Sequence, residues 1–561
     1  MTADVDVRHL SANFGGHVGS VGVGLVNMGV DIGEQYYTDD MEVEDGHAYR
    51  RRHGQIRFVT SDNDESEGDS DIESVGPPRP PARETSPDVS SIDSNHIKEK
   101  VLRESGRWTS NKKSRLTIPT LAHLMQRREI GMDARHHFTK GDQCLVNSRF
   151  LPNRYEKLAS YHHKVFCGTY SQSGDIFLSA CQDQHVRIYD TKQGNFELMK
   201  TIRARDVGWS VLDVAFSPDS NYMIYSSWSD CIHLCNIHGD HDVHESLVLS
   251  PGEHSFCIFS LMFSCDNREI IGGANDGCLY IYDRESNQRT LKIDAHDDDV
   301  NCVSFADNSS QILYSGGDDG LCKVWDRRTL REDSPAPVGV MAGHVDGITY
   351  IDTKGDARYF VSNSKDQTIK LWDNRMFSPK EGVEATKKAV SSQRWDYRWQ
   401  QVPRNLNRKK SVSGDTSVMT YRGHCVLHTL IRARFSPAFT TGQRYIYSGC
   451  ATGSVVVYDL LTGKVVKNLD GGHRSCVRDV SWHPYENNII SSSWDGTVGK
   501  WGYFDYWAHE AEEGEEKLGE DLEEEDDGRF SYRTRRQTAF KRSDRSRCKD
   551  EKNGCFNKLY D

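Results

Sequence analysis

An all-β fold, a β-propeller of seven blades, is predicted by three features of the sequence. Between residues 142 and 504, a pair consisting of an aromatic or apolar residue and, in most cases, Asp or Asn recurs seven times. Each repeat holds several short apolar strands separated by turn residues. One further strand candidate, without a blade of its own, lies just ahead of the first repeat and is available to close the ring.

The spacing of the recurring pairs is the first of these features. The pairs are Tyr189-Asp190, Cys235-Asn236, Tyr282-Asp283, Trp325-Asp326, Trp372-Asp373, Tyr458-Asp459 and Trp501-Gly502. Successive pairs are 43 to 47 residues apart, except for one interval of 86 residues before Tyr458. A period of about 40 to 45 residues is typical of four-stranded propeller blades. Residues 377–417, within the long interval, lack strand alternation and are rich in Lys, Arg, Gln and Asn, so we interpret them as an insertion rather than an eighth blade.

The strands within a repeat are the second feature. The first strand is a short apolar run that ends in a turn, as in residues 211–218, 258–264, 300–306, 430–437 and 477–484. A second strand follows, for example residues 312–315 or 359–362, and a third runs into the recurring pair. A fourth strand before the next Gly-His completes the blade.

Closure of the ring is the third feature. After Trp501 the sequence becomes acidic, so the last blade has no fourth strand of its own. Residues Cys144 to Phe150 are a strand candidate just before the first complete repeat. We expect this segment to pair into the last blade, because a closed ring leaves no exposed sheet edges.

The regions outside the repeats differ from the repeats in composition. Residues 1–93 contain acidic clusters, many serines and a proline tract at 77–81, and residues 505–561 are highly charged, so both ends are predicted to be disordered. Within residues 94–141, apolar residues at helical spacing predict two short helices. These residues are Ile97, Val101 and Leu102 in the first helix, and Leu121, Leu124 and Met125 in the second.

Composition and motifs exclude several classes of function. The net charge of -13 over 561 residues argues against direct binding of nucleic acid and against attraction to anionic membranes, and no apolar run reaches the about 18 residues of a membrane span. Fifteen cysteines without a CxxC pair, and an N-terminus without a secretory signal, indicate free thiols in a reducing compartment. The dense His and Cys groups lack zinc-site spacing and no nucleotide-binding motif occurs, so we predict no metal and no cofactor. These groups are His162-His163, Cys231 with Cys235, and His238 with His241 and His244.

A histidine followed by an aspartate recurs in four repeats. The pairs are His254 with Asp276, His296 with Asp319, His344 with Asp366, and His473 with Asp495. Catalysis needs one such constellation, whereas an architectural network needs one in each blade, so we predict a structural role and no catalytic residues. The region resembles WD-repeat proteins throughout, and in that family these two residues form a buried hydrogen-bond network. The blades that end at Cys235 and Tyr458 have Ser229 and Thr452 at the aspartate position, and we expect weaker networks there.

Two consecutive repeats share one further motif. They end in Trp325-Asp326-Arg327-Arg328 and Trp372-Asp373-Asn374-Arg375, each after a run of small residues, Asp and an apolar-basic pair. This pattern resembles the box of substrate receptors of the cullin-4 RING ubiquitin ligases, which bind the damaged-DNA-binding-protein adaptor. The third match, Trp395-Asp396-Tyr397-Arg398, follows no strand and is not interpreted as a blade ending.

The resemblance implies a function and a site. The adaptor would contact Trp325, Asp326, Arg328, Trp372, Asp373 and Arg375 on the bottom face, where the third strands end, and Arg suits this role because its rigid fork binds carboxylates or carbonyls in pairs. The insertion leaves directly after Arg375, so we expect it to emerge on the same face. The short helices ahead of the propeller match, in kind, the helices by which several such receptors hold the adaptor.

The predicted protein is therefore a non-catalytic substrate-recognition subunit of a cullin-4 RING ubiquitin ligase, and the alternative is a WD-repeat scaffold unrelated to ubiquitin. We hypothesise that Arg432 and Arg478 face the channel and bind an acidic segment of a protein substrate; the alternative is that they pair with neighbours such as Asp479. The basic residues within 533–549 resemble a nuclear signal, or else balance the acidic residues 512–527. We expect the protein in nucleus and cytoplasm.

Overall fold

The computed structural model of the chain describes residues 86–108, 120–130, 137–239, 241, 243–250, 255–403, 406 and 412–505. All of them belong to one compact unit, residues 72–561. Most of the two tails lies outside the described residues. His254 of the predicted network also lies outside them, as do four basic residues of the insertion, Arg404, Arg408, Lys409 and Lys410.

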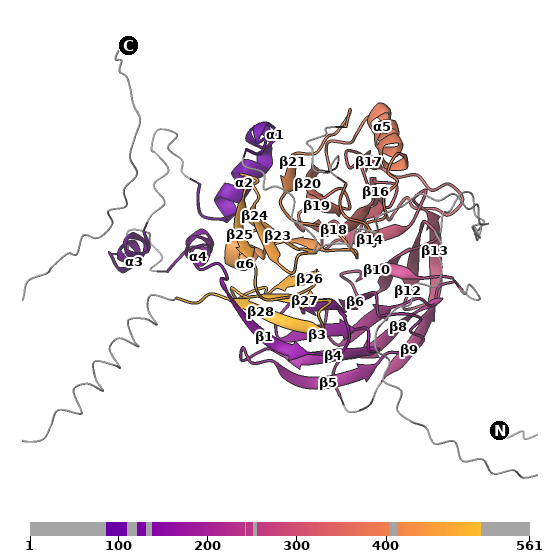
Figure 1. The fold of residues 1–561 in the computed structure, drawn as a ribbon, viewed down its shortest axis with the longest axis horizontal. Coiled ribbons are helices and arrows are strands. Elements are labelled where there is room, and N and C mark those ends of the chain that lie inside the picture. The colour runs from indigo at the N-terminus through magenta and orange to yellow at the C-terminus, as the bar shows by residue number, and fades with distance from the viewer. Residues whose placement is uncertain are drawn as a thin grey trace, which may run out of the picture. The chain divides into compact units, whose positions relative to one another are not determined.

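The described residues form seven four-stranded antiparallel sheets, which confirms the predicted seven-bladed propeller (Figure 1). Blade 1 consists of β2 (Val165–Tyr170), β3 (Ile176–Cys181), β4 (His185–Asp190) and β5 (Glu197–Arg203). Blade 2 consists of β6 (Asp213–Phe216), β7 (Tyr222–Ser226), β8 (Cys231–Asn236) and β9 (His244–Val248). Blade 3 consists of β10 (Ile258–Phe263), β11 (Glu269–Ala274), β12 (Cys278–Asp283) and β13 (Gln288–Asp294).

The remaining blades repeat this order. Blade 4 consists of β14 (Val300–Phe305), β15 (Ile312–Gly317), β16 (Cys322–Asp326) and β17 (Gly339–Met341). Blade 5 consists of β18 (Ile348–Thr353), β19 (Tyr359–Ser364), β20 (Thr368–Asp373) and β21 (Met419–Arg422). Blade 6 consists of β22 (Ala433–Phe435), β23 (Tyr445–Gly449), β24 (Val455–Asp459) and β25 (Val465–Leu469). Blade 7 consists of β26 (Val477–Trp482), β27 (Ile489–Ser493), β28 (Thr497–Gly502) and β1 (Arg154–Ser160).

The strand that closes the ring is β1, so the assignment of closure to Cys144–Phe150 was wrong. Strand β1 pairs antiparallel with β28, with Tyr155 opposite Trp501. Most of the segment assigned to closure belongs instead to helix α4 (Lys140–Asn147). The physical reason is its start: the Thr139 hydroxyl accepts from the Asp142 backbone N–H, and the Asp142 carboxylate accepts from the Thr139 N–H, a reciprocal cap that favours a helix.

Four short helices precede the propeller: α1 (Ser90–Ser94), α2 (His96–Glu104), α3 (Leu121–Ile130) and α4. Helices α2 and α3 coincide with the two that the apolar spacing predicts. All but the last residue of helix α1 falls inside residues 1–93, which were expected to be disordered. The helix is held because Ile92 is buried in the core between blades 5 and 6. No helix among the described residues is long and apolar enough to cross a membrane.

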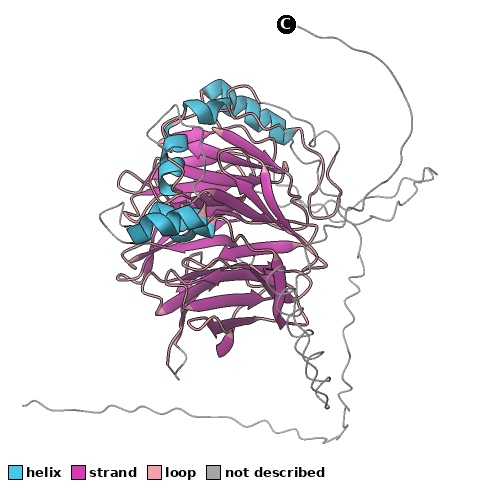
Figure 2. Ribbon diagram, turned by 90° about the vertical axis from the view of Figure 1, so that its left-hand side faces the viewer, coloured by secondary structure: helices cyan, strands magenta, loops and turns pink. Residues whose placement is uncertain are grey.

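Each blade runs between two faces of the ring. We call the end where the third strands finish the bottom face; there the first strand connects to the second and the third to the fourth. The opposite end, with the second-to-third turns and the connections between blades, is the top face. Figure 2 shows the sheets edge-on, with the helices beside them.

The insertion between β20 and β21 begins at the bottom end of β20, where we expect it to emerge, but it does not stay on the bottom face. Its helix α5 (Lys380–Ser391) places Val390 against Gly320, a residue of the top-face turn of blade 4. Further along, the indole of Trp395 donates to Asp346 Oδ2 at 2.9 Å, and the His428 backbone N–H donates to the Tyr397 carbonyl at 2.8 Å, both at the top. The exit point fixed only where the segment begins. Ser378, three residues after Arg375, already bonds to Ala342 at the top end of β17, so the chain has left the bottom face before α5 starts.

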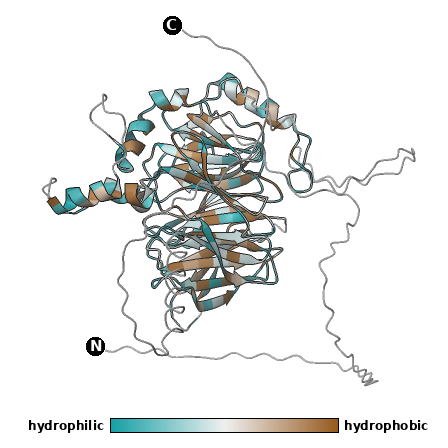
Figure 3. Cartoon of the chain, turned by 60° about the vertical axis from the view of Figure 1, so that its left-hand side comes forward, coloured by the Kyte–Doolittle hydropathy of each residue, from teal (hydrophilic) through white to brown (hydrophobic). Residues whose placement is uncertain are grey.

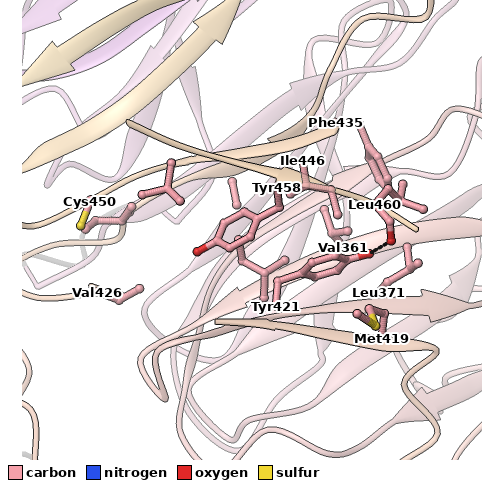
Figure 4. Close-up of a cluster of buried hydrophobic side chains, with 14 of the residues drawn as sticks. Val361, Leu371, Met419, Tyr421, Val426, Phe435, Ile446, Cys450, Tyr458 and Leu460 are labelled. Atoms are coloured by element: carbon pink, nitrogen blue, oxygen red, sulfur yellow. Dashed lines mark hydrogen bonds between the residues drawn. The ribbon is translucent and has the colours of Figure 1, made fainter. Parts of the chain in front are cut away.

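The core lies between neighbouring sheets, and the apolar residues follow the strands (Figure 3). Between blades 5 and 6, Val361, Leu371 and Ile446 pack around two buried tyrosines, Tyr421 and Tyr458 (Figure 4). The Tyr421 hydroxyl donates to the Leu460 carbonyl at 2.8 Å, which satisfies its polar atom inside the core.

Candidate functional site

The repeated His-Asp pairs form buried networks in blades 4, 5 and 7. In blade 5, His344 Nδ1 lies 2.9 Å from Asp366 Oδ2 and His344 Nε2 lies 2.7 Å from Ser362 Oγ. The Trp372 indole N–H donates to the same Ser362 hydroxyl at 2.7 Å. Burial raises the pKa of Asp366, but the nearby His344 and the hydrogen bonds to the carboxylate outweigh it and hold the pKa well below its usual range. The four groups satisfy one another, which fits a structural role.

Blades 4 and 7 repeat the arrangement with the same residue types. The His296 Nδ1–Asp319 and His473 Nδ1–Asp495 distances are 3.0 and 3.3 Å. The Trp325 and Trp501 indoles donate to Ser315 and Ser491 at 2.9 and 2.8 Å. Blade 3 differs: Asp276 accepts from the Tyr280 hydroxyl at 2.7 Å and pairs with Lys292 at 3.0 Å.

The two tryptophans of the predicted adaptor site are part of these networks. Trp325 and Trp372 are both buried, and Asp373 is buried as well. A partner protein on the bottom face would therefore not touch the indole rings. Of the six residues assigned to adaptor binding, the two arginines are the ones whose side chains are exposed.

Arg328 lies at the bottom end of blade 4 and is engaged by its own motif. Its Nε and Nη2 atoms donate to Asp326 Oδ1 and Oδ2 at 2.9 and 2.7 Å. The side chain nevertheless remains 66% exposed. The hydrogen bonds from Arg328 lower the pKa of Asp326, so the pair is ionised at neutral pH.

Arg375, at the equivalent position of blade 5, is exposed and differently placed. Its backbone N–H donates to Asp373 Oδ1, but the Asp373 carboxylate is already held by other groups. Arg358 Nε and Nη2 donate to Asp373 Oδ1 and Oδ2 at 3.0 and 2.7 Å, and Asn95 Nδ2 donates to Oδ2 at 3.1 Å. No side chain among the described residues pairs with the Arg375 guanidinium, which leaves its donors available to a partner.

The difference between the two motifs has a cause that sequence reasoning missed. An arginine 15 residues before the terminal aspartate binds that aspartate in blades 3, 5 and 6. These pairs are Arg268–Asp283, Arg358–Asp373 and Arg444–Asp459. In blade 4 the same position is Gln311, so Asp326 is left for Arg328. The recurrence of Arg at a fixed offset was the signal available in the sequence.

Helices α1 and α2 lie on the same face, next to Arg375. Asn95, which caps α2, accepts from the Tyr359 hydroxyl at 2.7 Å in addition to its bond to Asp373. At the far end of α2, Glu104 pairs with Lys354 at 2.7 Å, in the bottom-face loop of blade 5. The N-terminal helices and the exposed Arg375 therefore border one continuous surface across blades 5 and 6.

The two arginines assigned to substrate binding are not available to a substrate. Arg432 and Arg478 are both buried. Arg432 Nη1 and Nη2 pair with Asp479 and Asp213 at 3.1 and 2.6 Å. Arg478 Nη2 donates to the Leu212 carbonyl at 2.9 Å. The assignment was wrong because carboxylates and carbonyls of other blades already bind both guanidinium groups. For Arg432 this includes Asp479, the partner that the alternative interpretation named.

Exposed aromatic side chains mark the top face. Trp209, between blades 1 and 2, is 49% exposed, and Trp228, in the top turn of blade 2, is 41% exposed. Trp209 packs edge-on against Phe166, which also contacts Trp494 of blade 7. Aromatic residues with one exposed face are enriched in protein interfaces.

The seven blades and the Trp-Ser-His-Asp networks define a WD-repeat β-propeller, and comparison with known proteins agrees. The WD domain, G-beta repeat model matches residues 155–190, 196–236, 287–326, 335–373 and 463–501. A Caenorhabditis elegans protein named DDB1- and CUL4-associated factor 11 homolog is 44% identical over 371 residues, 64% of this chain and 64% of that protein. The match thus spans slightly less than two thirds of that relative.

Two further relatives are covered more fully. A Caenorhabditis briggsae protein of the same name is 42% identical over 65% of this chain and 67% of its own length. A LEC14B homolog from Prunus armeniaca is 40% identical over 70% of this chain and 83% of its own length. The chain belongs to the family of WD-repeat proteins that contains these relatives, and the family resemblance stated from the sequence is confirmed.

Proposed function

We propose that the chain is a substrate-recognition subunit of a cullin-4 RING ubiquitin ligase and that its bottom face binds the DDB1 adaptor. The observation that carries the proposal is the Arg375 guanidinium, exposed and unpaired among the described residues, beside helices that cover the same face. The names of two relatives, which refer to association with DDB1 and CUL4, support it. The protein would supply proximity, while a separate enzyme transfers ubiquitin.

The two arginines would contribute unequally to adaptor binding. Arg328 must give up part of its pairing with Asp326 to bind a partner, whereas Arg375 has no ion pair to lose within the described part of the chain. An unpaired guanidinium that is desolvated against carboxylates or carbonyls is typical of an interface hot spot. We therefore expect Arg375→Ala to weaken DDB1 binding by about tenfold or more, and Arg328→Ala to weaken it less.

A direct binding titration of the full chain with purified DDB1 tests the proposal. The chain offers a matched control, because Arg398 belongs to the same four-letter motif and binds Asp396 at 2.6 Å, but lies on the top face. The expected result is lost binding in Arg328→Ala/Arg375→Ala and unchanged binding in Arg398→Ala. Full binding by a correctly folded double variant would leave the alternative, a WD-repeat scaffold without a ligase partner.

The N-terminal helices are tested separately. Asn95→Ala removes the cap of α2 together with its bonds to Tyr359 and Asp373. If the helices form part of the adaptor surface, this variant binds DDB1 more weakly although both arginines are intact. Unchanged binding would restrict the site to the two Trp-Asp-x-Arg motifs.

The target protein would lie on the opposite side, on the top face. The buried Arg432–Asp213 pair crosses the centre of the ring, which favours the rim over the channel as the binding surface. Trp209 and Trp228 are two exposed aromatic residues there. Changing both to Ala should reduce capture of targets from cells while DDB1 binding persists, and unchanged capture would contradict this placement.

A further inference from the structure

Blade 2 lacks the polar network that blades 4, 5 and 7 share, and its third strand ends in Cys235 instead of Trp. In blade 4, the network histidine His296 stands 29 residues before Trp325; Asp206 stands at the same offset before Cys235. The aspartate position of the network is taken by Ser229. Blade 2 therefore cannot form the usual pair, and a different set of polar residues meets at this place.

That set consists of Asp206, Cys231 and His233. One ligand atom from each lies within 4.8 Å of the others. His233 Nε2 is 3.2 Å from Asp206 Oδ2 and 3.5 Å from Cys231 Sγ. Asp206 comes from the connection between blades 1 and 2, and the other two from the top end of β8, so the cluster lies on the top face.

The two distances from His233 are close to those of a tetrahedral zinc site. With bonds of about 2.3 Å to sulfur and about 2.0 to 2.2 Å to nitrogen and oxygen, tetrahedral geometry places ligand atoms about 3.3 to 3.6 Å apart. The two measured distances fall at or next to this range. A thiolate, an imidazole and a carboxylate are also the ligand types that zinc prefers, whereas calcium and magnesium require mainly oxygen.

The environment of each ligand is consistent with this chemistry. His233 is buried and stacks on Tyr225, with ring centroids 5.0 Å apart, so its ring is fixed in place. Cys231 is buried, whereas the Asp206 side chain is 64% exposed, so an ion and one water molecule can enter from the solvent side.

We propose that Asp206, Cys231 and His233 bind a zinc ion that joins the connection between blades 1 and 2 to strand β8. The ion takes the place of the hydrogen-bond network that this blade lacks. It forms a bond to the Cys231 sulfur, whose proton is released to solvent, and leaves a fourth position to water. Because Trp209 follows Asp206 by three residues, the ion also fixes one of the exposed aromatic residues of the top face.

The test is zinc binding by the full chain after removal of metal with a chelator. We expect one tightly bound zinc per chain, and a thiolate-to-metal absorption band when cobalt replaces zinc. Asp206→Asn changes an exposed residue and should not disturb folding. The double variant Asp206→Asn/Cys231→Ser should reduce the affinity for zinc by more than the roughly 10- to 100-fold that follows the loss of a residue hydrogen-bonded to a zinc ligand.

A matched control distinguishes this site from histidines and cysteines elsewhere in the chain. Cys278 occupies the same place at the start of the third strand in blade 3, close to Asp276, but Tyr280 stands where blade 2 has His233. Cys278→Ser should keep the zinc, the cobalt band and the rise in melting temperature that zinc produces in the wild-type chain. The proposal is overturned if the folded chain binds no zinc, or if Asp206→Asn and Cys231→Ser bind it as tightly as Cys278→Ser.

Discussion

Arg432 connects blades on opposite sides of the ring. It directly precedes strand β22 of blade 6, and its Nη2 atom lies 2.6 Å from Asp213 Oδ1 of blade 2. Its Nη1 atom pairs with Asp479 of blade 7 at 3.1 Å. All three side chains are buried. The sheets of a propeller pack against neighbouring sheets, so this group of three side chains adds a polar connection between blades that are not neighbours.

This connection predicts a large loss of stability when one partner is removed. Arg432→Met leaves Asp213 without its cation and Asp479 with only part of its pairing, and an uncompensated buried charge costs about 3 to 5 kcal/mol. Chemical denaturation of the two proteins measures the difference. The double variant Arg432→Met/Asp213→Leu should recover part of the loss, because it removes both charges; an equal or larger loss would contradict the argument.

The polar networks of individual blades predict a second difference. Asp366 of blade 5 accepts from His344, the Val345 N–H and Thr368, whereas Thr452 at the equivalent position of blade 6 bonds only to side chains, those of Cys450 and Ser454. Asp366→Ala should cost about 3 kcal/mol, because it strands a buried donor on His344. Thr452→Ala should cost less than about 1 kcal/mol. Similar losses in thermal or chemical unfolding would show that the blades do not differ in this way.

The propeller was predictable because its signals repeat. Seven similar endings at regular spacing identify the blades even where Trp is replaced by Tyr or Cys, and a His-Asp pair in several repeats indicates structure rather than catalysis. Features that occur once gave weaker signals. Four of the seven positions of strand β1 are charged or exposed, or both, so the strand shows no apolar alternation, and the capped apolar segment before it resembled a strand.

The functional residues were predictable in part. The motif predicts two arginines on the bottom face of neighbouring blades, because the third strands of all blades end at that face. Their internal partners did not follow, since Asp373 is engaged by Asn95, 278 residues away in the sequence. Arg432 and Arg478 were misassigned for the same reason: a first-strand arginine indicates the channel side, but not whether carboxylates or carbonyls of other blades already bind its guanidinium group.

Closure of the ring by β1 predicts that weakening this strand lowers stability and promotes self-association. Tyr155 packs against Trp501 and His473, with ring centroids 4.9 and 5.2 Å apart. Tyr155→Ala should destabilise the chain by about 2 to 4 kcal/mol and expose the edge of β28, which favours self-association. Light scattering and unfolding measurements check both effects. Phe150→Ala, in the segment first assigned to closure, is the control and should leave the chain monodisperse to the same degree as wild type.

A buried histidine predicts how stability depends on pH. His424 is fully buried in blade 6, with Nδ1 2.9 Å from the Tyr458 hydroxyl and Nε2 2.8 Å from Asn363 Oδ1. Burial lowers its pKa from 6.5 to about 4. Between these values the unfolded chain binds a proton that the folded chain does not, so stability is complete above pH 6.5 and falls as the pH decreases toward 4.

The size of this effect is set by the shift, and a substitution isolates it. A change from 6.5 to about 4 corresponds to about 3 kcal/mol of stability lost across the window. His424→Gln keeps a side chain that donates and accepts but does not titrate, so its free energy of unfolding should vary less between pH 6.5 and 4 than that of wild type. His428→Gln, four residues further on and only half-buried, controls for loss of a histidine as such. An unchanged pH dependence in His424→Gln would show that the acid sensitivity arises elsewhere.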